Sequence, residues 1–364
     1  MLNSRPGSST ADLRWTHRLA VVLAVATLLL IWVGAMVTTY QAGMAVPDWP
    51  TTYGYNLFLY PWKSWWHGPF DLFIEHGHRL LGAAVGLLVI GLVAVTWRSS
   101  SNGYLRWAVC GALALVIFQG LLGGMRVLRD ARTLAMVHGC VAPLFFAYTI
   151  ALCAVSSAWW ADGSSLHGRP RQDLILPFGW AALAALLIYV QILVGAHVRH
   201  VPVAAEPGFF RAVVLFHLTL AAFVLLHVAG VGYQALKRAA DRVVPRVACI
   251  LASLLILQLV LGAGSWVLKY GWPMGLADRY RWAAQTTLVA GSLPFALTVT
   301  AHVTVGSLLL GLAVWLVLRT ARPLLVEPTL AGEESACRGR SSIVKATGGW
   351  TYPMAVCEPA GAGQ

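Results

Sequence analysis

The feature that most constrains this chain is a series of long apolar runs. Eight runs of about 20 residues, the length that crosses roughly 30 Å of hydrocarbon, are separated by charges and by Gly or Pro clusters. A transmembrane β-barrel would show short alternating segments instead. Hydrophobic residues make up 58% of the chain and charged residues 11%, and the mean hydropathy is +0.70. The sequence therefore predicts an all-α, multi-pass integral protein of a lipid bilayer.

The eight transmembrane helices are predicted from the limits of these runs. The first run lacks a following small-residue cleavage site, so it is interpreted as a retained helix and not as a signal peptide. Residues 1–16 then form a cytoplasmic N-terminus, and residues 319–364, rich in Gly, Ser, Arg and Pro, are predicted to be a disordered cytoplasmic tail. The predicted spans are residues 17–39, 78–97, 105–124, 134–157, 174–195, 211–234, 247–268 and 295–318.

The distribution of Lys and Arg predicts the orientation of the spans. With the N-terminus inside, 16 of the 26 basic residues fall in inside segments, and the strongest single indication is the loop from Lys237 to Arg246, with four basic residues in ten. Because basic residues are enriched in cytoplasmic loops, both termini are predicted to be cytoplasmic, with the chain in the cell (inner) membrane. The net charge of +12 comes without a basic stripe in a soluble domain, so no nucleic-acid partner is expected.

Four histidines occupy comparable places in the even-numbered spans. His78, His138, His217 and His302 fall in the first turns of spans two, four, six and eight, all of which run inward from the outer face. They are therefore expected at similar depth, near the outer boundary. A lone membrane histidine is usually a hydrogen-bonded packing residue, but ionisable groups at membrane depth often mark sites, and four equivalent ones favour a site.

Short motifs divide the chain into two halves. The segment Val33–Ala35 corresponds to Val194–Ala196, and Gln119–Gly124 corresponds to Gln258–Gly264. Small residues allow close backbone approach between membrane helices, which a bulky flat ligand would require. The chain is thus predicted to form two pseudo-symmetric four-helix bundles related by an axis along the membrane normal, at residues 17–157 and 174–318.

Imidazoles on facing helices can supply the axial pair of a heme iron. The pairs would be His78 with His138, and His217 with His302. Other metal centres fit less well. A di-iron carboxylate bundle needs two Glu-x-x-His motifs, whereas Glu75-x-x-His78 stands alone.

The segment Glu75-His76-Gly77-His78-Arg79 places four ionisable side chains at the mouth of the second span. The aromatic loop before it, residues 41–74, is interpreted either as an interfacial belt or as a lid over a site near His78. Arginine suits carboxylates, so Arg79, Arg126 and Arg132, on the same outer side, are candidates for contacts to heme propionates. For each arginine, snorkelling to the interface or contact with lipid phosphate is the alternative.

Together these motifs resemble the heme A synthase family over about residues 15–318. The glutamate, the histidine and the arginine at the mouth of a helix, after an Asp-Trp-Pro loop and inside a 4+4 repeat, are the most specific part. The resemblance rests on Gly34–Gly43, Pro47-Asp48-Trp49-Pro50, Glu75–Arg79, Gln119–Gly124 before His138, Phe216-His217, and His302.

The resemblance implies an oxidoreductase that converts the C8 methyl of heme O to a formyl group, giving heme A for terminal oxidase biogenesis. It implies heme b as a cofactor in the C-terminal half, with His217 and His302 as axial ligands, and heme O as substrate beside His78 and His138. Glu75 matches the family's catalytic glutamate. A heme O synthase and an electron acceptor are the implied partners, while the oxygen source, direct docking of that synthase and homo-oligomer formation are left open.

The chain departs from many bacterial members of that family because residues 40–76 contain no cysteine. It therefore resembles the cysteine-free branch. Two rival interpretations remain: a bis-His membrane b-type cytochrome that carries electrons, and a heme-transfer protein. Neither requires Glu75, whose position three residues before His78 puts both side chains on one helix face.

Overall fold

The computed structural model describes residues 10–325 except 162–170, 203, 239–241, 286 and 290. In these residues eight helices are long and apolar enough to cross a membrane, and no strand is present beyond an isolated bridge between Thr52 and Tyr55. The predicted all-α membrane class is confirmed. The predicted tail lies mostly outside the described residues.

The eight long helices are joined by short connections and by two longer loops. The longer loops carry the one-turn elements η1 (Ala42–Met44), α2 (Trp62–Trp66), α10 (Met274–Ala277) and α11 (Arg281–Ala284), and α6 (Ala158–Ala161) follows the fourth long helix. The long helices are α1 (Thr10–Thr39), α3 (Phe70–Ser99), α4 (Gly103–Leu128), α5 (Arg132–Val155), α7 (Arg171–His200), α8 (Pro207–Arg238), α9 (Val243–Tyr270) and α12 (Leu293–Leu325).

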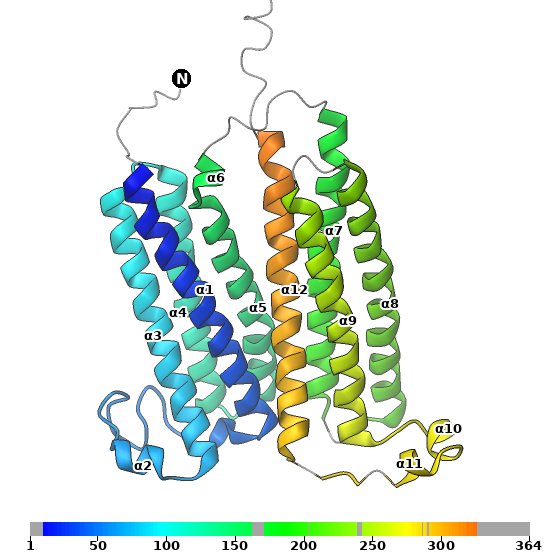
Figure 1. Ribbon diagram of the computed structural model, residues 1–364. Coiled ribbons are helices and arrows are strands. Elements are labelled where there is room, and N and C mark those ends of the chain that lie inside the picture. Colours follow the sequence, from blue (N-terminus) through cyan, green and yellow to red (C-terminus); the bar gives the residue numbers. More distant parts are fainter. Residues whose placement is uncertain are drawn as a thin grey trace, which may run out of the picture.

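These helices pack as two groups that lie side by side (Figure 1). In the first, α1 packs on α3, α3 on α4, α4 on α5, and α5 on α1. In the second, α7 packs on α8, α8 on α9, α9 on α12, and α12 on α7. The order of neighbours is therefore the same in both groups. The N-terminal end of α1 and the C-terminal end of α12 lie at the same end of the molecule (Figure 1). The helices α3, α5, α8 and α12 all begin at the opposite end.

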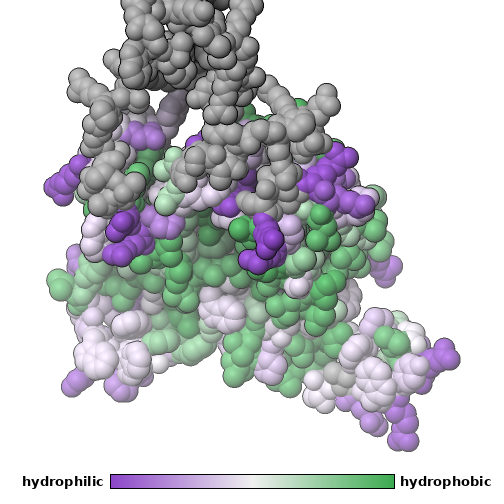
Figure 2. Space-filling view, turned by 45° about the horizontal axis from the view of Figure 1, so that its top comes forward, coloured by the Kyte–Doolittle hydropathy of each residue, from purple (hydrophilic) through white to green (hydrophobic). Residues whose placement is uncertain are grey.

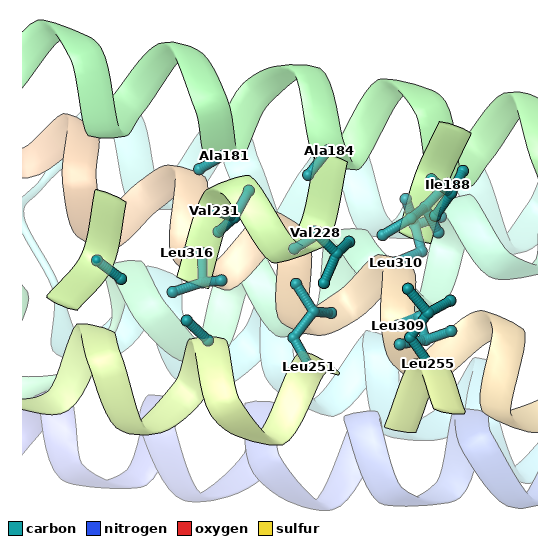
Figure 3. Packing of buried hydrophobic residues seen from close by; sticks show 14 of the residues in the cluster. Ala181, Ala184, Ile188, Val228, Val231, Leu251, Leu255, Leu309, Leu310 and Leu316 are labelled. Carbon is teal, nitrogen blue, oxygen red and sulfur yellow. The ribbon is translucent and has the colours of Figure 1, made fainter. Parts of the chain in front are cut away.

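Each group has its own apolar core. The first-half core includes Leu23 of α1 and Leu92 of α3, both fully buried. The second-half core, shown in Figure 3, joins α7, α8, α9 and α12 through residues such as Leu251 and Leu316. The two groups meet where Phe146 of α5 packs at Gly311 of α12, at which a Cβ atom would lie 2.8 Å from the phenyl ring. The absence of a side chain at Gly311 thus lets α5 and α12 pack closely, and this contact joins the two halves.

The surface of the molecule agrees with a membrane location. On the face shown in Figure 2, hydrophobic residues cover the middle of the helices and hydrophilic residues gather toward their ends. Large apolar side chains such as Leu226 and Leu87 are exposed on the surface of the molecule. Because hydrocarbon is as apolar as these side chains, such exposure is stable only in lipid.

The helices extend further than the predicted spans, which corrects one expectation. α3 begins at Phe70, about two turns before His78, and α8 begins at Pro207, well before His217. The four histidines therefore do not lie in the first turns of their helices. Apolar runs mark only the part of a helix that crosses hydrocarbon, and polar helical turns continue beyond it. At the other end, α12 continues through Leu325, so residues 319–325 are helical and not part of a tail.

Candidate functional site

Each of the four predicted histidines lies against a glycine of the preceding long helix. At each glycine, a Cβ atom would approach the imidazole Cε1 more closely than ordinary van der Waals contact allows. Only a residue without a side chain leaves room for the ring there. We call these glycines the notch glycines; the Cβ–Cε1 distances are 2.8 Å for Gly34 and His78, 3.3 Å for Gly123 and His138, 3.1 Å for Gly195 and His217, and 3.0 Å for Gly262 and His302.

The structure brings His78 of α3 and His138 of α5 together, as predicted. Their ring centroids are 6.4 Å apart and the ring planes are nearly perpendicular, at 87°. Two metal–nitrogen bonds of about 2 Å, with half a ring on either side, span a separation of that size. Both Nδ1 atoms are buried and make no hydrogen bond of good geometry in the described residues, although the backbones of Leu30 and Gln119 lie close to the two rings. The ring separation therefore fits an axial pair of a heme iron.

His302 of α12 is held in one tautomer. Its Nδ1 lies 3.1 Å from the carbonyl oxygen of Gln258, which can only accept, so Nδ1 carries the proton. The lone pair then resides on Nε2, which is the arrangement that metal-binding histidines adopt. His217 of α8 lies close enough to interact electrostatically with His302. The pairing of His217 with His302 as axial ligands stays a prediction.

Three glutamines accompany the notch glycines. Gln119, Gln191 and Gln258 each stand four residues before a notch glycine. The amide of Gln119 donates to the His138 carbonyl at 3.3 Å, and that of Gln191 donates to the His217 carbonyl at 3.0 Å. The Gln258 amide lies 3.5 Å from Nε2 of His302. The glutamine on α7 escaped the sequence reasoning, although its spacing to Gly195 repeats that of the other two.

Glu75 is the centre of a buried charge network at the start of α3. Its side chain is 1% exposed. One oxygen, Oε2, accepts the Val46 N–H at 2.8 Å, and the other, Oε1, accepts from Arg79 at 3.0 Å. Arg126 of α4 approaches Oε1 to 3.9 Å. A buried carboxylate is stable only when hydrogen bonds or positive charges offset its lost hydration. Here the same partners also fix the orientation of the Glu75 carboxylate.

Arg79 attaches the loop between α1 and α3 to this network. Its Nη1 donates to the carbonyls of Asp48 (2.7 Å) and Thr51 (3.0 Å), and its Nη2 donates to that of Val46 (2.7 Å). These contacts are those of a loop anchor. As a contact to heme propionate, Arg79 stays a prediction.

The loop crosses the end of the first half, where two further contacts fix it. Trp49 lies where a Cβ atom of Gly124 on α4 would be, and the guanidinium of Arg126 fills the space beside Gly43. His76 is 1% exposed, with Nδ1 3.0 Å from Thr52 Oγ1. The loop therefore contacts α3 and α4 next to the His78–His138 pair, as expected of a lid.

Asp48 stabilises the turn at the tip of this loop. Its carboxylate accepts the N–H groups of Tyr53 and Gly54, each at 2.8 Å, and the Thr51 hydroxyl. Partial burial alone would raise the pKa of Asp48, but these three donors together hold that pKa below its ordinary value. The carboxylate is thus a structural part of the loop.

Arg199 of α7 connects the two halves. Its Nη2 donates to Thr39 Oγ1 at 2.7 Å and to the Ala35 carbonyl at 3.0 Å, both on α1. It also lies within electrostatic range of His302. Nothing in its sequence neighbourhood indicates this contact.

Other polar residues lie apart from the two pairs. Arg132 is exposed at the first residue of α5, so its contact to a propionate stays a prediction. His227 stacks on Trp180 at 4.6 Å and bonds to its carbonyl at 2.9 Å. In the residues that the structure describes, no group of three or more His, Cys, Asp or Glu could hold a metal ion. The arrangement is therefore one of paired imidazoles.

Comparison with known proteins gives one family match. The family model described as COX15-CtaA, cytochrome oxidase assembly protein, matches residues 17–206. This region contains Glu75, His78 and His138, whereas His217 and His302 lie beyond it. More than half of the chain is covered by this one family.

The curated relatives include heme A synthases and a protoheme IX farnesyltransferase. The chain is 29% identical to a heme A synthase of Shouchella clausii (strain KSM-K16) over 187 residues, which is 50% of this chain and 58% of that protein. It is 32% identical to a heme A synthase of Rhodopseudomonas palustris (strain BisA53) over 151 residues, 39% of this chain and 41% of that protein. A protoheme IX farnesyltransferase of Haloarcula marismortui is 32% identical over 120 residues, 32% of this chain and 23% of that protein. The chain thus spans less than two thirds of the length of these relatives.

Proposed function

The chain belongs to the COX15-CtaA family of cytochrome oxidase assembly proteins, and on that premise we propose that it is a heme A synthase. In this proposal it oxidises the C8 methyl of heme O to a formyl group and so supplies heme A to terminal oxidases. The observation that carries the proposal is the His78–His138 pair on facing helices, with the buried Glu75 three residues before His78. An oxidoreductase that acts on heme needs both a heme-binding site and a side chain that can accept or donate a proton.

The two histidine pairs would hold two hemes. His78 and His138 would line the site for heme O, and His217 and His302 would bind a resident heme b. The 6.4 Å separation of the His78 and His138 rings and the protonated Nδ1 of His302 support this assignment. When bound, heme iron supplies the one-electron redox chemistry that the side chains lack.

The side chains around Glu75 would prepare the substrate site. Glu75 is fixed by Val46, Arg79 and Arg126, so its carboxylate can hold a proton or stabilise positive charge at one defined place. Arg126 also carries the positive charge nearest to that carboxylate after Arg79, which suits a propionate. The loop over this end of the first half would exclude water.

The proposal includes a particular membrane arrangement. The identical order of helix neighbours supports two pseudo-symmetric halves related by an axis along the membrane normal. The basic loop after α8 supports cytoplasmic termini and a location in the cell (inner) membrane. A heme O synthase would supply the substrate, and an electron acceptor would reoxidise the resident heme. Any homo-oligomer would form in the bilayer.

Heme extraction and chromatography test the proposal. The chain would be expressed with a heme O synthase in a host that lacks heme A, beside the variants Glu75→Gln and His78→Ala. We expect heme A in membranes with the wild-type chain and none with either variant, while Glu75→Gln still binds heme. Heme b alone, with heme O unchanged beside a folded wild-type chain, would refute the enzyme and favour an electron-carrying cytochrome. Heme A formed by Glu75→Gln would refute the role of Glu75.

A further inference from the structure

The four histidine positions differ in what holds them. Three of the four helices that carry a notch glycine place a glutamine four residues before it, and these glutamines contact the histidine of the next helix. On α1 the equivalent position, four residues before Gly34, is Leu30. Both histidines of the second half therefore have a glutamine beside them, and only one histidine of the first half does.

Leu30 points at the helix that carries His78. Its Cδ1 lies 3.9 Å from the place of a Cβ atom at Gly82, one turn beyond His78 on α3, and the side chain packs on the first-half core. At this position a methyl group thus replaces an amide that can donate a hydrogen bond. The polar group of α1 that lies close to the His78 ring is therefore the backbone of Leu30, and His78 Nδ1 makes no hydrogen bond of good geometry in the described residues. By contrast, the Gln191 amide lies 3.1 Å from His217 Nδ1 as well as 3.0 Å from the His217 carbonyl.

We propose that this one difference makes the first half an exchange site and the second half a retention site for heme. A histidine whose helix turn is already fixed loses less freedom when it binds a metal, and so it releases the metal more slowly. Loss of a partner that orients a metal-binding histidine typically lowers affinity about 10–100-fold. The inference rests on the proposed function, because a substrate heme must enter and leave whereas a resident heme must stay.

Heme transfer to an acceptor protein tests this inference without any enzyme assay. Full-length chain loaded with protoheme in both halves would be mixed with excess apomyoglobin, and heme loss would be followed by absorbance. Two backgrounds separate the sites: His217→Ala with His302→Ala leaves only the first site, and His78→Ala with His138→Ala leaves only the second. Because protoheme is the probe at both sites, substrate chemistry does not enter the result.

The informative variants exchange the two side chains. We expect the first site to lose heme at least about 10-fold faster than the second, Leu30→Gln to slow that loss about 10–100-fold, and Gln191→Leu to speed loss from the second site by a similar factor. Gln234→Leu is the matched control, because it removes a half-buried glutamine, with a buried Oε1, near the other end of α8. It should leave both rates unchanged.

Three results would overturn the inference: equal rates at the two wild-type sites, an unchanged first-site rate in Leu30→Gln, or an unchanged second-site rate in Gln191→Leu. The Gln191→Leu variant keeps the test decisive if Leu30→Gln does not fold, because it only replaces an amide by an apolar group of similar size. Absence of heme A beside unequal rates would refute the proposed function alone. Heme A formed by a chain with equal rates would refute only the inference.

Discussion

Arg199 of α7 donates a 2.7 Å hydrogen bond to Thr39 Oγ1 of α1, across the boundary between the two halves. The same nitrogen bonds to the carbonyl of Ala35, the residue after the notch glycine that accommodates His78. The guanidinium also lies within electrostatic range of His302. One side chain thus links the helix behind the first histidine pair to the second pair.

Loss of this link should affect stability and, at the proposed second site, the bound heme. We expect Arg199→Leu to lower stability by about 1.5–3 kcal/mol, the usual contribution of hydrogen bonds to a charged group, and to lower the midpoint potential of the heme proposed to bind at His217 and His302. A nearby positive charge favours the reduced form, so its removal favours the oxidised one. Thermal unfolding and a redox titration would measure the two effects.

Thr39→Val is the matched control for Arg199→Leu. It removes one acceptor and leaves the guanidinium with the Ala35 carbonyl, so it should cost less stability and leave the potential unchanged. Equal heme midpoint potentials in wild type and Arg199→Leu would show that the arginine only stabilises the contact between α7 and α1.

The notch at Gly34 should be needed for heme binding but not for folding. In Gly34→Ala the added methyl would lie 2.8 Å from His78 Cε1, and the ring at the end of a side chain can move more easily than the two helices. We expect the protein to fold with its usual helix content and to lose heme at the first site. Gly86→Ala is the control, because a Cβ atom there meets nothing within 4 Å. Pyridine hemochrome absorbance per mole of protein measures the heme content. A full heme content in Gly34→Ala would contradict the prediction that heme binding needs the space at Gly34.

The main role of Arg79 should be to fix the loop between α1 and α3, and not to bind a heme propionate. Its planar fork donates to three loop carbonyls and to Glu75 at once, which the single ammonium of lysine cannot do. We therefore expect Arg79→Lys to make residues 41–69 several-fold more sensitive to protease in the absence of heme. Arg132→Lys, at an exposed position, should leave cleavage unchanged. Wild-type cleavage in Arg79→Lys would favour the alternative, a contact to heme propionate.

The number of helices and the histidines could be predicted from the sequence, because both depend on local signals. A run of about 20 apolar residues is sufficient to predict a membrane helix, and His78, His138, His217 and His302 stand out as polar residues within such runs. The helix ends were placed too far inward, as at Phe70, because polar turns outside the hydrocarbon carry no apolar signal.

The contacts between segments far apart could not be predicted in this way. Arg199 and Thr39 are separated by 160 positions, and nothing local to either residue indicates the other. The glutamine–glycine spacing is different, since Gln191 and Gly195 repeat a pattern seen at Gln119 and Gln258. Aligning the helices on their notch glycines would have revealed it, together with the exception at Leu30.

The turn at Asp48 should depend on pH in a predictable direction. Three donors hold the pKa of this carboxyl below its ordinary value, so the folded turn favours the ionised form. Its contribution to stability is complete above the unfolded pKa of about 3.9, and it is lost as the pH falls through the lower, folded pKa. Asp48→Asn should therefore loosen the loop at neutral pH and make little difference in strong acid.

Hydrogen exchange of the loop amides would measure this dependence. The amides of Tyr53 and Gly54 donate to the Asp48 carboxylate, so their protection should fall in Asp48→Asn at pH 7. The difference from wild type should narrow as the pH drops below about 4. Thr51→Val removes one donor and keeps the charge, so its loss of protection at pH 7 should be smaller, and its remaining protection should disappear completely at a higher pH than in wild type. A wild-type to Asp48→Asn difference that stays constant down to pH 2 would show that the turn does not depend on the charge of Asp48.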